Sequence, residues 1–217
     1  DDRLVGFILH GVDGAAACNV GTGVLPAYRG RRLVQEMYAF VMPLLRQKGV
    51  RHLGLEVITD NAAAIKAYER AGFVICRTLL CFAGEVVDQP ERALTIRSRP
   101  VTSEQLGKAS GHGSYAWDHI DAGILALADA YQLYEVCKDD TFIGQIVLHP
   151  DTGILARCDL AGPETLEGYR CLLEAAGRVQ RKIRIVNVDE RLRTRISAIG
   201  ESGLLLTLKQ YEMERAL

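Results

Sequence analysis

The sequence predicts an α/β protein built from two mixed sheets that are covered by helices. Strand-like and helix-like segments alternate along its 217 residues, which is typical of parallel strands joined by crossover helices. Over residues 20–73 the order is strand, loop, helix, strand, helix. A similar order returns in the second half of the chain, so we expect two copies of one structural unit.

The first copy is expected to hold four strands and two helices. Apolar residues at helical spacing mark the first helix, and Gly49 ends it. Pro43 is expected to kink this helix because proline has no N–H to donate to the carbonyl of Ala39. The expected strands are 4–10, 16–25, 51–58 and 74–82, and the expected helices run over 31–48 and from Asp60 or Asn61 to Gly72.

The second copy is longer, and a polar stretch separates it from the first. We expect two domains, 1–84 and 93–217, with residues 84–92 as the linker. Pro163 is expected in the first turn of a helix, where its missing N–H costs nothing. The expected strands are 94–101, 131–137, 142–149, 154–160, 183–188 and 204–213, the expected helices are 163–181 and 190–199, and the stretch through Ala128 is helical or irregular.

The two copies match at a hairpin, where Val5–Leu9 is similar to Ile143–Val147. Residues 94–142 come before this hairpin in the second copy, whereas only four residues come before it in the first. The first copy therefore lacks the opening strand and helices of the second. Either the chain is a fragment, or those residues were lost.

The composition gives no sign of a membrane or nucleic-acid partner. The formal net charge is −1, which offers no general attraction for polyanions. No apolar run reaches the roughly 18 residues of a membrane-spanning helix, and no signal peptide is visible. We expect a packed globular protein of the cytoplasm, and homo-oligomerisation stays open.

The six cysteines and five histidines predict no metal centre. The cysteines form no CxxC pair, and the histidines lack the spacing of metal ligands. Several cysteines lie in apolar, strand-like runs. We interpret them as buried thiols of a reducing compartment rather than as a disulfide framework.

A segment rich in glycine and arginine is the first candidate site. Gly21 and Gly23 interrupt a strand, which fits either the close approach of a ligand or a loosely packed edge. The loop that follows carries Arg29, Arg31 and Arg32 at the start of a helix, where unpaired N–H groups attract a pyrophosphate. The alternative is a solvated basic helix start.

A second segment gives this loop a chemical context. The run L-E-V-I-T-D-N-A-A-A-I-K-A-Y-E-R-A-G-F contains the pattern N-x-x-A-x-x-x-Y-x-x-x-G-F, and V-L-P-A-Y-R-G opens the loop. Together they resemble the GNAT superfamily of N-acetyltransferases, in particular the ribosomal-protein-alanine N-acetyltransferases. The resemblance covers residues 4–82 closely and residues 94–213 only in element order. It implies a tandem pair of GNAT-like mixed sheets, the first lacking its N-terminal elements and the second degenerate.

The resemblance implies a site for acetyl-CoA with a role for each matching residue. Glu56 would take a proton from the attacking amine, Tyr68 would protonate the leaving thiolate, and Asn61 would bond the cofactor arm. The pantetheine arm would lie along the strand, and the pyrophosphate would lie in the loop. The implied cofactor-binding residues are Thr22, Gly23 and Val24 of the strand, Arg29, Gly30, Arg31, Arg32, Leu33 and Val34 of the loop, and Asn61.

The polar residues of this site also have purely structural interpretations. Glu56 fits an exposed strand position, Tyr68 fits a core aromatic, and Asn61 fits a helix cap. The loop departs from the family pattern, because Arg32 and Val34 hold two places where glycine lets the phosphate approach the backbone. Arg32 either crowds the phosphate or contacts it.

The second copy carries none of this chemistry. Its counterpart of the loop is A-G-P-E-T-L, which has no arginine, and the place of Tyr68 falls on Ile196 or Ile199. We expect this copy to pack against the first and to help shape the acceptor site. Trp117 and Tyr169 fit core or interface positions better than ligand positions.

These observations predict an acetyl-CoA-dependent N-acetyltransferase that works by direct attack of an amine, with no covalent enzyme intermediate. The alternative is a non-catalytic CoA-binding or protein-interaction module derived from such an enzyme. The acceptor stays open between a protein N-terminus, a lysine, a polyamine and a small drug.

Overall fold

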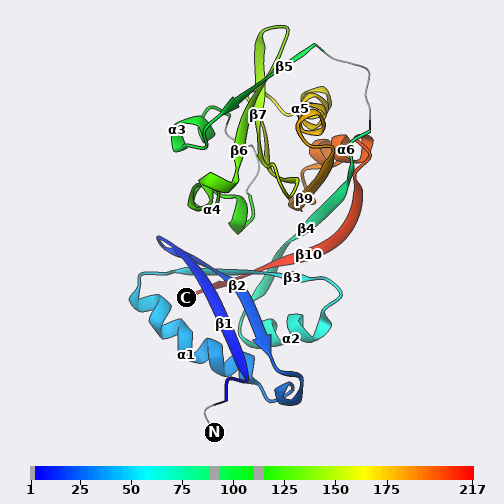
Figure 1. Ribbon diagram of the computed structural model, residues 1–217. Coiled ribbons are helices and arrows are strands. Elements are labelled where there is room, and N and C mark those ends of the chain that lie inside the picture. Colours follow the sequence, from blue (N-terminus) through cyan, green and yellow to red (C-terminus); the bar gives the residue numbers. More distant parts are fainter. Residues whose placement is uncertain (1–2, 88–92, 110–114) are drawn as a thin grey trace. The chain divides into compact units, whose positions relative to one another are not determined.

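A computed structural model describes residues 3–87, 93–109 and 115–217, and these residues divide into two compact units (Figure 1). The first unit holds the chain up to Thr78 together with Lys209–Leu217, and the second holds Leu79–Leu208. The expected linker over 84–92 falls partly on strand, and residues 88–92 lie outside the described ranges.

The first unit is a mixed sheet with two helices. Within it the strands follow the order β1-β2-β3-β10-β4, and β4 and β10 each contribute only the part that belongs to this unit. Its elements are β1 (Gly6–Asp13), β2 (Ala16–Val24), η1 (Pro26–Tyr28), α1 (Leu33–Gln47), β3 (His52–Ile58), α2 (Ala62–Arg70), β4 (Val74–Glu85) and β10 (Leu205–Ala216).

The last strand of the chain joins the first unit. The expected second domain, 93–217, included this strand. In the structure β10 pairs antiparallel with β3, from Gln210 opposite Ile58 to Ala216 opposite His52. Met213, which is completely buried, packs into the core of the first unit. This long-range pairing groups Lys209–Leu217 with the first unit.

The second unit is a sheet in the order β4-β9-β8-β7-β6-β5. Its α5 begins at Leu166, because the Thr165 side chain accepts a hydrogen bond from the Gly168 N–H and caps the helix. The expectation that Pro163 occupies the first turn is therefore wrong. The other elements are β5 (Leu94–Arg99), α3 (Ser103–Leu106), η2 (Trp117–His119), α4 (Asp121–Ala126), η3 (Ala128–Ala130), β6 (Gln132–Lys138), β7 (Thr141–His149), β8 (Ile154–Leu160), α5 (Leu166–Val179), β9 (Lys182–Asp189) and α6 (Arg193–Glu201).

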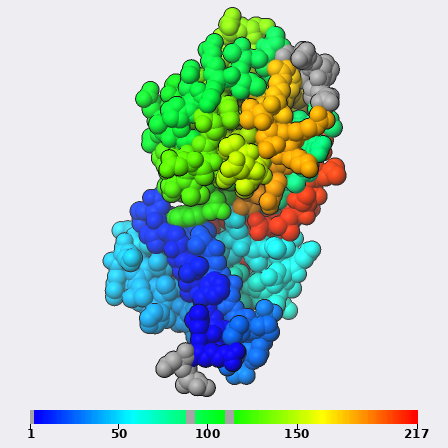
Figure 2. All heavy atoms as spheres, in the orientation of Figure 1, coloured from blue at the N-terminus to red at the C-terminus, as the bar shows by residue number. Residues whose placement is uncertain are grey.

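The two units differ in how many faces of their sheets are covered. In the second unit α5 and α6 pack on one face, and Leu106 of α3 and Ile124 of α4 pack on Val147 of the other. In the first unit α1 and α2 share one core cluster with the sheet. On its other face Phe7 and Leu9 are 46% and 55% exposed, and β1 and β2 lie uncovered in the blue part of the surface in Figure 2.

Matching registers show which residues of the two units are equivalent. Gly6 lies opposite Val24 in the first unit, as Gly144 lies opposite Leu160 in the second. Leu9 is thus the counterpart of Val147, which is completely buried. In the second unit α3 and α4 cover this face, and the described residues of the first unit contain no helix in that place.

Five of the six cysteines are buried, Cys76 is exposed, and all six are free thiols. Among the described residues no group of histidine, cysteine or acidic side chains could hold a metal ion. None of the helices in the described ranges is long and apolar enough to cross a membrane.

Candidate functional site

A cleft of about 570 Å³ opens in the first unit at the end of β2, between the start of α1 and the length of α2. It gathers most of the predicted site residues: Thr22, Gly23, Val24, Arg29, Gly30, Arg32, Leu33, Val34, Asn61 and Tyr68. Among the residues that line it, Glu56 and Arg31 are absent.

The cleft exists because two parallel strands separate. β2 pairs with β3 only from Ala16 opposite His52 to Asn19 opposite Leu55. A bulge follows, in which Val20 has no partner on β1. Bulges bend a strand and end its pairing. The rest of β2, which includes Thr22 to Val24, therefore turns one edge to the cleft.

The loop before α1 leaves backbone donors for an anion. Gly30 has φ 76° and Arg32 has φ 62°, so both adopt the left-handed conformation. Arg32 is the N-cap of α1, and no side chain caps this helix. The first N–H groups of such a helix have no acceptor within the helix and can donate to a ligand, and the helix dipole favours a negatively charged one.

Four basic side chains reach the cleft, and none of the residues that line it is acidic. Arg29 and Arg32 come from the loop, and Lys66 and Arg70 come from α2. The Nε of Arg29 donates to the Val24 carbonyl oxygen at 3.1 Å. This charge suits a ligand that carries several phosphates.

Arg31 lies apart from this group. Its Nη2 donates to the carbonyl oxygen of Ala27 at 3.3 Å, and its guanidinium stacks over the Tyr28 ring with 5.1 Å to the ring centroid. The side chain thus folds back on its own loop.

Asn61 both caps α2 and lines the cleft. Its side-chain oxygen accepts a hydrogen bond from the Ala64 N–H at 3.1 Å and caps α2. The residue also lines the cleft. The predicted cap is confirmed, and it engages only the oxygen of the amide.

Tyr68 is half-buried, with its ring against the core and one side toward the cleft. Its ring meets Tyr38 and Phe73 edge-on, at centroid distances of 6.3 Å and 6.1 Å. No other described residue forms a hydrogen bond with its hydroxyl. The side chain thus packs as a core aromatic while its polar end stays available for a ligand.

Glu56 lies on the other face of the sheet. Leu55 and Val57 point into the core beneath α1 and α2, and successive residues of a strand point to opposite faces. Across the ladder Glu56 faces Glu212, whose carboxylate accepts two hydrogen bonds from Arg77, at 2.5 Å and 2.9 Å.

One of the two strand glycines has an intramolecular explanation. A Cβ at position 23 would lie 2.5 Å from the Phe7 ring, which crosses the strand there. A Cβ at position 21 would meet its nearest neighbours at an ordinary 3.6 Å. A side chain at position 23 would therefore force the Phe7 ring to move, whatever binds in the cleft.

The sequence interpretation missed Tyr28, Gln35, Lys66 and Arg70, which also line the cleft. The helical period carries a signal for two of them. Lys66 and Arg70 are four residues apart and therefore share a face of α2.

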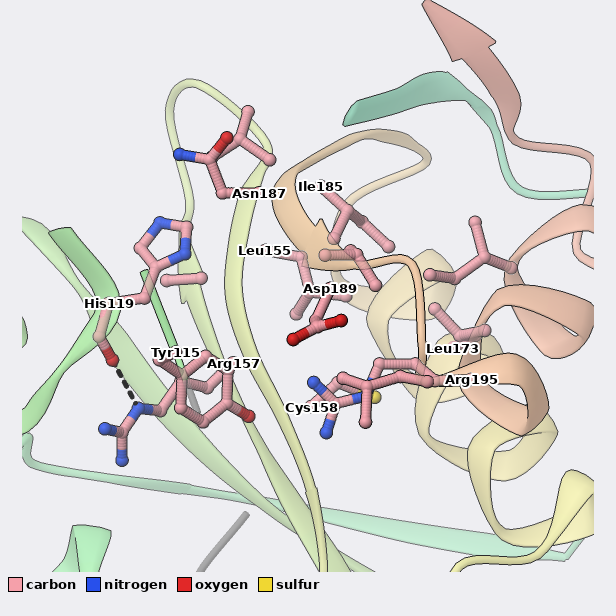
Figure 3. Close-up of a pocket in the computed structure, with 15 residues that line it drawn as sticks. Tyr115, His119, Leu155, Arg157, Cys158, Leu173, Ile185, Asn187, Asp189 and Arg195 are labelled. Atoms are coloured by element: carbon pink, nitrogen blue, oxygen red, sulfur yellow. Dashed lines mark hydrogen bonds between the residues drawn. The ribbon is translucent and has the colours of Figure 1, made fainter. Parts of the chain in front are cut away.

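Among the described residues of the second unit, the place that corresponds to the cleft holds a small cavity. The counterparts of Thr22, Gly23 and Val24 are Cys158, Asp159 and Leu160, by the register given above. The cavity at this place measures about 20 Å³, and Arg195 of α6 lines it. Figure 3 shows this side chain reaching from α6 toward Cys158.

The helix caps settle which residue replaces Tyr68. Asn61 caps α2 with φ −88° and ψ 66°, and Leu192 caps α6 with φ −78° and ψ 63°. Counting from these caps, Ile199 takes the place of Tyr68, and it is buried. The open alternative, Ile196, is excluded.

Burial shifts the pKa values of the polar groups around this small cavity. It raises the pKa of the Asp159 carboxyl, and it lowers the pKa of His119 to about 4, with a further contribution from Arg157. Arg157 donates to the His119 carbonyl oxygen at 2.8 Å, and the Tyr115 hydroxyl donates to Asp159. Tyr169 is buried beside Arg195, as expected for a core residue.

Comparison with solved structures places the fold among the GNAT acetyltransferases. A tandem GNAT protein from the clavulanic acid biosynthesis pathway superposes with a TM-score of 0.68 at 11% identity, over 99% of this chain and 79% of that one. A GCN5-related N-acetyltransferase from Sphaerobacter thermophilus gives 0.62 at 13% identity, over 97% and 76%. The chain thus has the tandem GNAT fold.

A similarity to this family is also found in the sequence. Residues 1–73 match the model of the acetyltransferase (GNAT) family. A streptothricin acetyltransferase of Streptomyces lavendulae is 40% identical over 53 residues, which are 24% of this chain. Acetyltransferase SG1711 of Sodalis glossinidius is 28% identical over 89 residues, which are 41% of this chain. The matches span 28% and 63% of these two relatives.

Proposed function

We propose that the protein transfers the acetyl group of acetyl-CoA to an amine by direct attack. The observation that carries this proposal is the cleft of the first unit, whose basic side chains come without any acidic one. Acetyl-CoA brings a pyrophosphate and a further phosphate, and the site offers helix N–H groups and arginines for them.

The residues of the cleft have separate tasks in this proposal. The N–H groups at the start of α1 bind the pyrophosphate together with Arg29 and Arg32. The free edge of β2 at Thr22–Val24 lies along the pantetheine arm and donates to the acetyl carbonyl. The amide nitrogen of Asn61 bonds the same arm.

Two residues move protons in the reaction. The amine nitrogen forms a bond to the thioester carbon, and the carbon–sulfur bond breaks. Tyr68 gives its proton to the departing thiolate, since a phenol is protonated at neutral pH. Glu56 takes a proton from the amine, directly or through water, from the opposite face of the sheet. The acceptor amine therefore enters from the side of the sheet on which Glu56 lies.

A steady-state assay with a panel of amine acceptors tests these roles. Tyr68→Phe should leave acetyl-CoA affinity nearly intact and lower turnover by about 10²-fold or more, the usual contribution of a positioned acid. Glu56→Gln should lower turnover most at acidic to neutral pH, where the free amine is scarce. Tyr211→Phe is the control, because Tyr211 packs on the same core and does not line the cleft. Full activity in Tyr68→Phe would leave this tyrosine as core packing only.

A second candidate function is binding of CoA without turnover. The position of Glu56 outside the cleft favours it, as does Arg32 in a place where the family pattern has glycine. A chain that binds acetyl-CoA and acetylates none of the four acceptor classes would have this function.

A further inference from the structure

The point where β2 leaves β3 carries a hydrogen-bond cluster that the proposed function does not use. The last pair of the β2–β3 ladder is Asn19 with Leu55, and both strands continue beyond it. The first backbone groups of β2 past this point have lost their partner strand. Unpaired backbone groups in a partly buried place are costly.

The side chain of Asn19 forms hydrogen bonds with groups of β2 that lie beyond the end of the β2–β3 ladder. Its oxygen accepts from the Gly21 N–H at 2.9 Å. Its amide nitrogen donates to the Thr22 hydroxyl at 2.7 Å and to the Tyr38 hydroxyl at 2.5 Å. Asn19 is only 8% exposed, so these are bonds made away from bulk water, where they are strongest.

The orientation of this amide is determined by its partners. A backbone N–H can only donate, so the oxygen of Asn19 must face Gly21. The amide nitrogen then points at Thr22 and Tyr38. Two of the three bonds fix the bulged end of β2 internally, and the third ties it to Tyr38 of α1.

Tyr38 anchors the cluster in the core. It is 1% exposed, and burial raises the pKa of its hydroxyl. Its ring contacts the rings of His10, Tyr68 and Phe73. The same tyrosine thus touches the strand that lines the cleft and the proposed acid.

The second unit supplies an internal comparison. By the register of the hairpins, Leu155 stands in the place of Asn19 and Arg157 in the place of Gly21. This unit has only the cavity of about 20 Å³ at that point. The strands β8 and β9 also separate there, after the single pair Ile154–Arg184, but side chains that include Arg195 line the small space between them. The cluster of Asn19 therefore distinguishes the unit whose separated strand edge stays open.

We propose that Asn19 and Tyr38 are positioning residues that hold the end of β2 away from β3 and so preform the edge that receives the acyl-pantetheine arm. This inference rests on the proposed function for its ligand. The clamp itself, meaning the three hydrogen bonds of Asn19, is a property of the free protein.

Amide hydrogen exchange of the free protein tests the clamp without any ligand. The Gly21 N–H should exchange slowly in the natural protein and at least 10-fold faster in Asn19→Leu, which has a similar volume and no polar group. Asn19→Asp should restore part of the protection, because a carboxylate can accept from Gly21 and from both hydroxyls. Should Asn19→Leu fail to fold, Tyr38→Phe removes one bond and keeps the ring packing.

Acetyl-CoA affinity tests the purpose of the clamp. Tyr38→Phe and Asn19→Leu should weaken binding about 10-fold, with a smaller loss in Asn19→Asp. Tyr169→Phe is the matched control, since Tyr169 is an equally buried tyrosine whose hydroxyl donates to Glu164 in the second unit. It should lower the melting temperature and leave the affinity unchanged.

The outcomes separate the two proposals. A folded Tyr38→Phe variant with unchanged Gly21 exchange and unchanged affinity overturns the clamp. A natural protein that does not bind acetyl-CoA overturns the proposed function, and the exchange of Gly21 then still decides whether the clamp exists.

Discussion

At position 32 the chain holds an arginine in a left-handed backbone conformation. Glycine adopts this conformation without cost, whereas a residue with a Cβ is strained by about 1 kcal/mol. The family pattern has glycine at this place, and the backbone angle of 62° shows the physical reason. Keeping arginine here implies a gain elsewhere, and the cleft that Arg32 lines is where we expect it.

Two substitutions separate the backbone of Arg32 from its side chain. Arg32→Gly should be more stable than Arg32→Ala by about 1 kcal/mol, since only glycine relieves the left-handed strain. Both should weaken acetyl-CoA binding by roughly 1.5–3 kcal/mol if the guanidinium contacts phosphate. Thermal melting and calorimetric titration measure the two effects. Arg46→Ala, on the exposed last turn of α1, is the control. Tighter binding in Arg32→Gly would mean that the arginine obstructs the site.

His119 makes the second unit sensitive to acid. Burial holds its pKa at about 4, below the usual 6.5. The unfolded chain therefore binds a proton between these values while the folded chain does not. The neutral His119 therefore adds to the free energy of unfolding. This contribution, on the order of 3 kcal/mol, is complete above pH 6.5 and is lost as the pH falls toward 4. Chemical denaturation at pH values from 7.5 to 4 should show the free energy of unfolding falling with pH. This dependence on pH should be weaker in His119→Gln. An identical slope in both proteins would place the titrating group elsewhere.

At the scale of elements, local patterns predicted more than long-range pairing. Alternating apolar residues located β3, and Asn61 located the start of α2, because both signals lie within a few residues of the structure they determine. The partner of β10 could not be predicted, since its pairing with β3 joins residues far apart in sequence. Pro163 misled the prediction of α5 because Thr165 is the better cap.

The pairing of β10 with β3 gives a prediction for a residue near the C-terminus. Met213→Ala should cost about 2–5 kcal/mol, as expected for a completely buried side chain. Because Met213 packs in the core of the first unit, the loss should appear in the unfolding of that unit and weaken acetyl-CoA binding. Leu206→Ala, on the same strand at 47% exposure, should change stability far less. Equal effects in both variants would contradict the pairing.

At the scale of the whole molecule, two units of one fold differ at the place of the cleft, which is open in the first unit and nearly filled in the second. The repeat was visible in the order of elements, and the absence of arginine from A-G-P-E-T-L indicated which copy lost its loop. The sequence did not show that side chains fill the place of the cleft in the second copy. It depends on Arg195, whose guanidinium lies over the rings of Tyr115 and Tyr169 inside the fold.

Calorimetric titration of the chain with acetyl-CoA tests the central claim most directly. We expect saturable binding of one acetyl-CoA per chain, because the first unit has an open basic cleft, while the corresponding cavity among the described residues of the second measures about 20 Å³. Binding should weaken as salt rises, since charged groups meet the phosphates. Absence of binding, or two equal sites per chain, would contradict it.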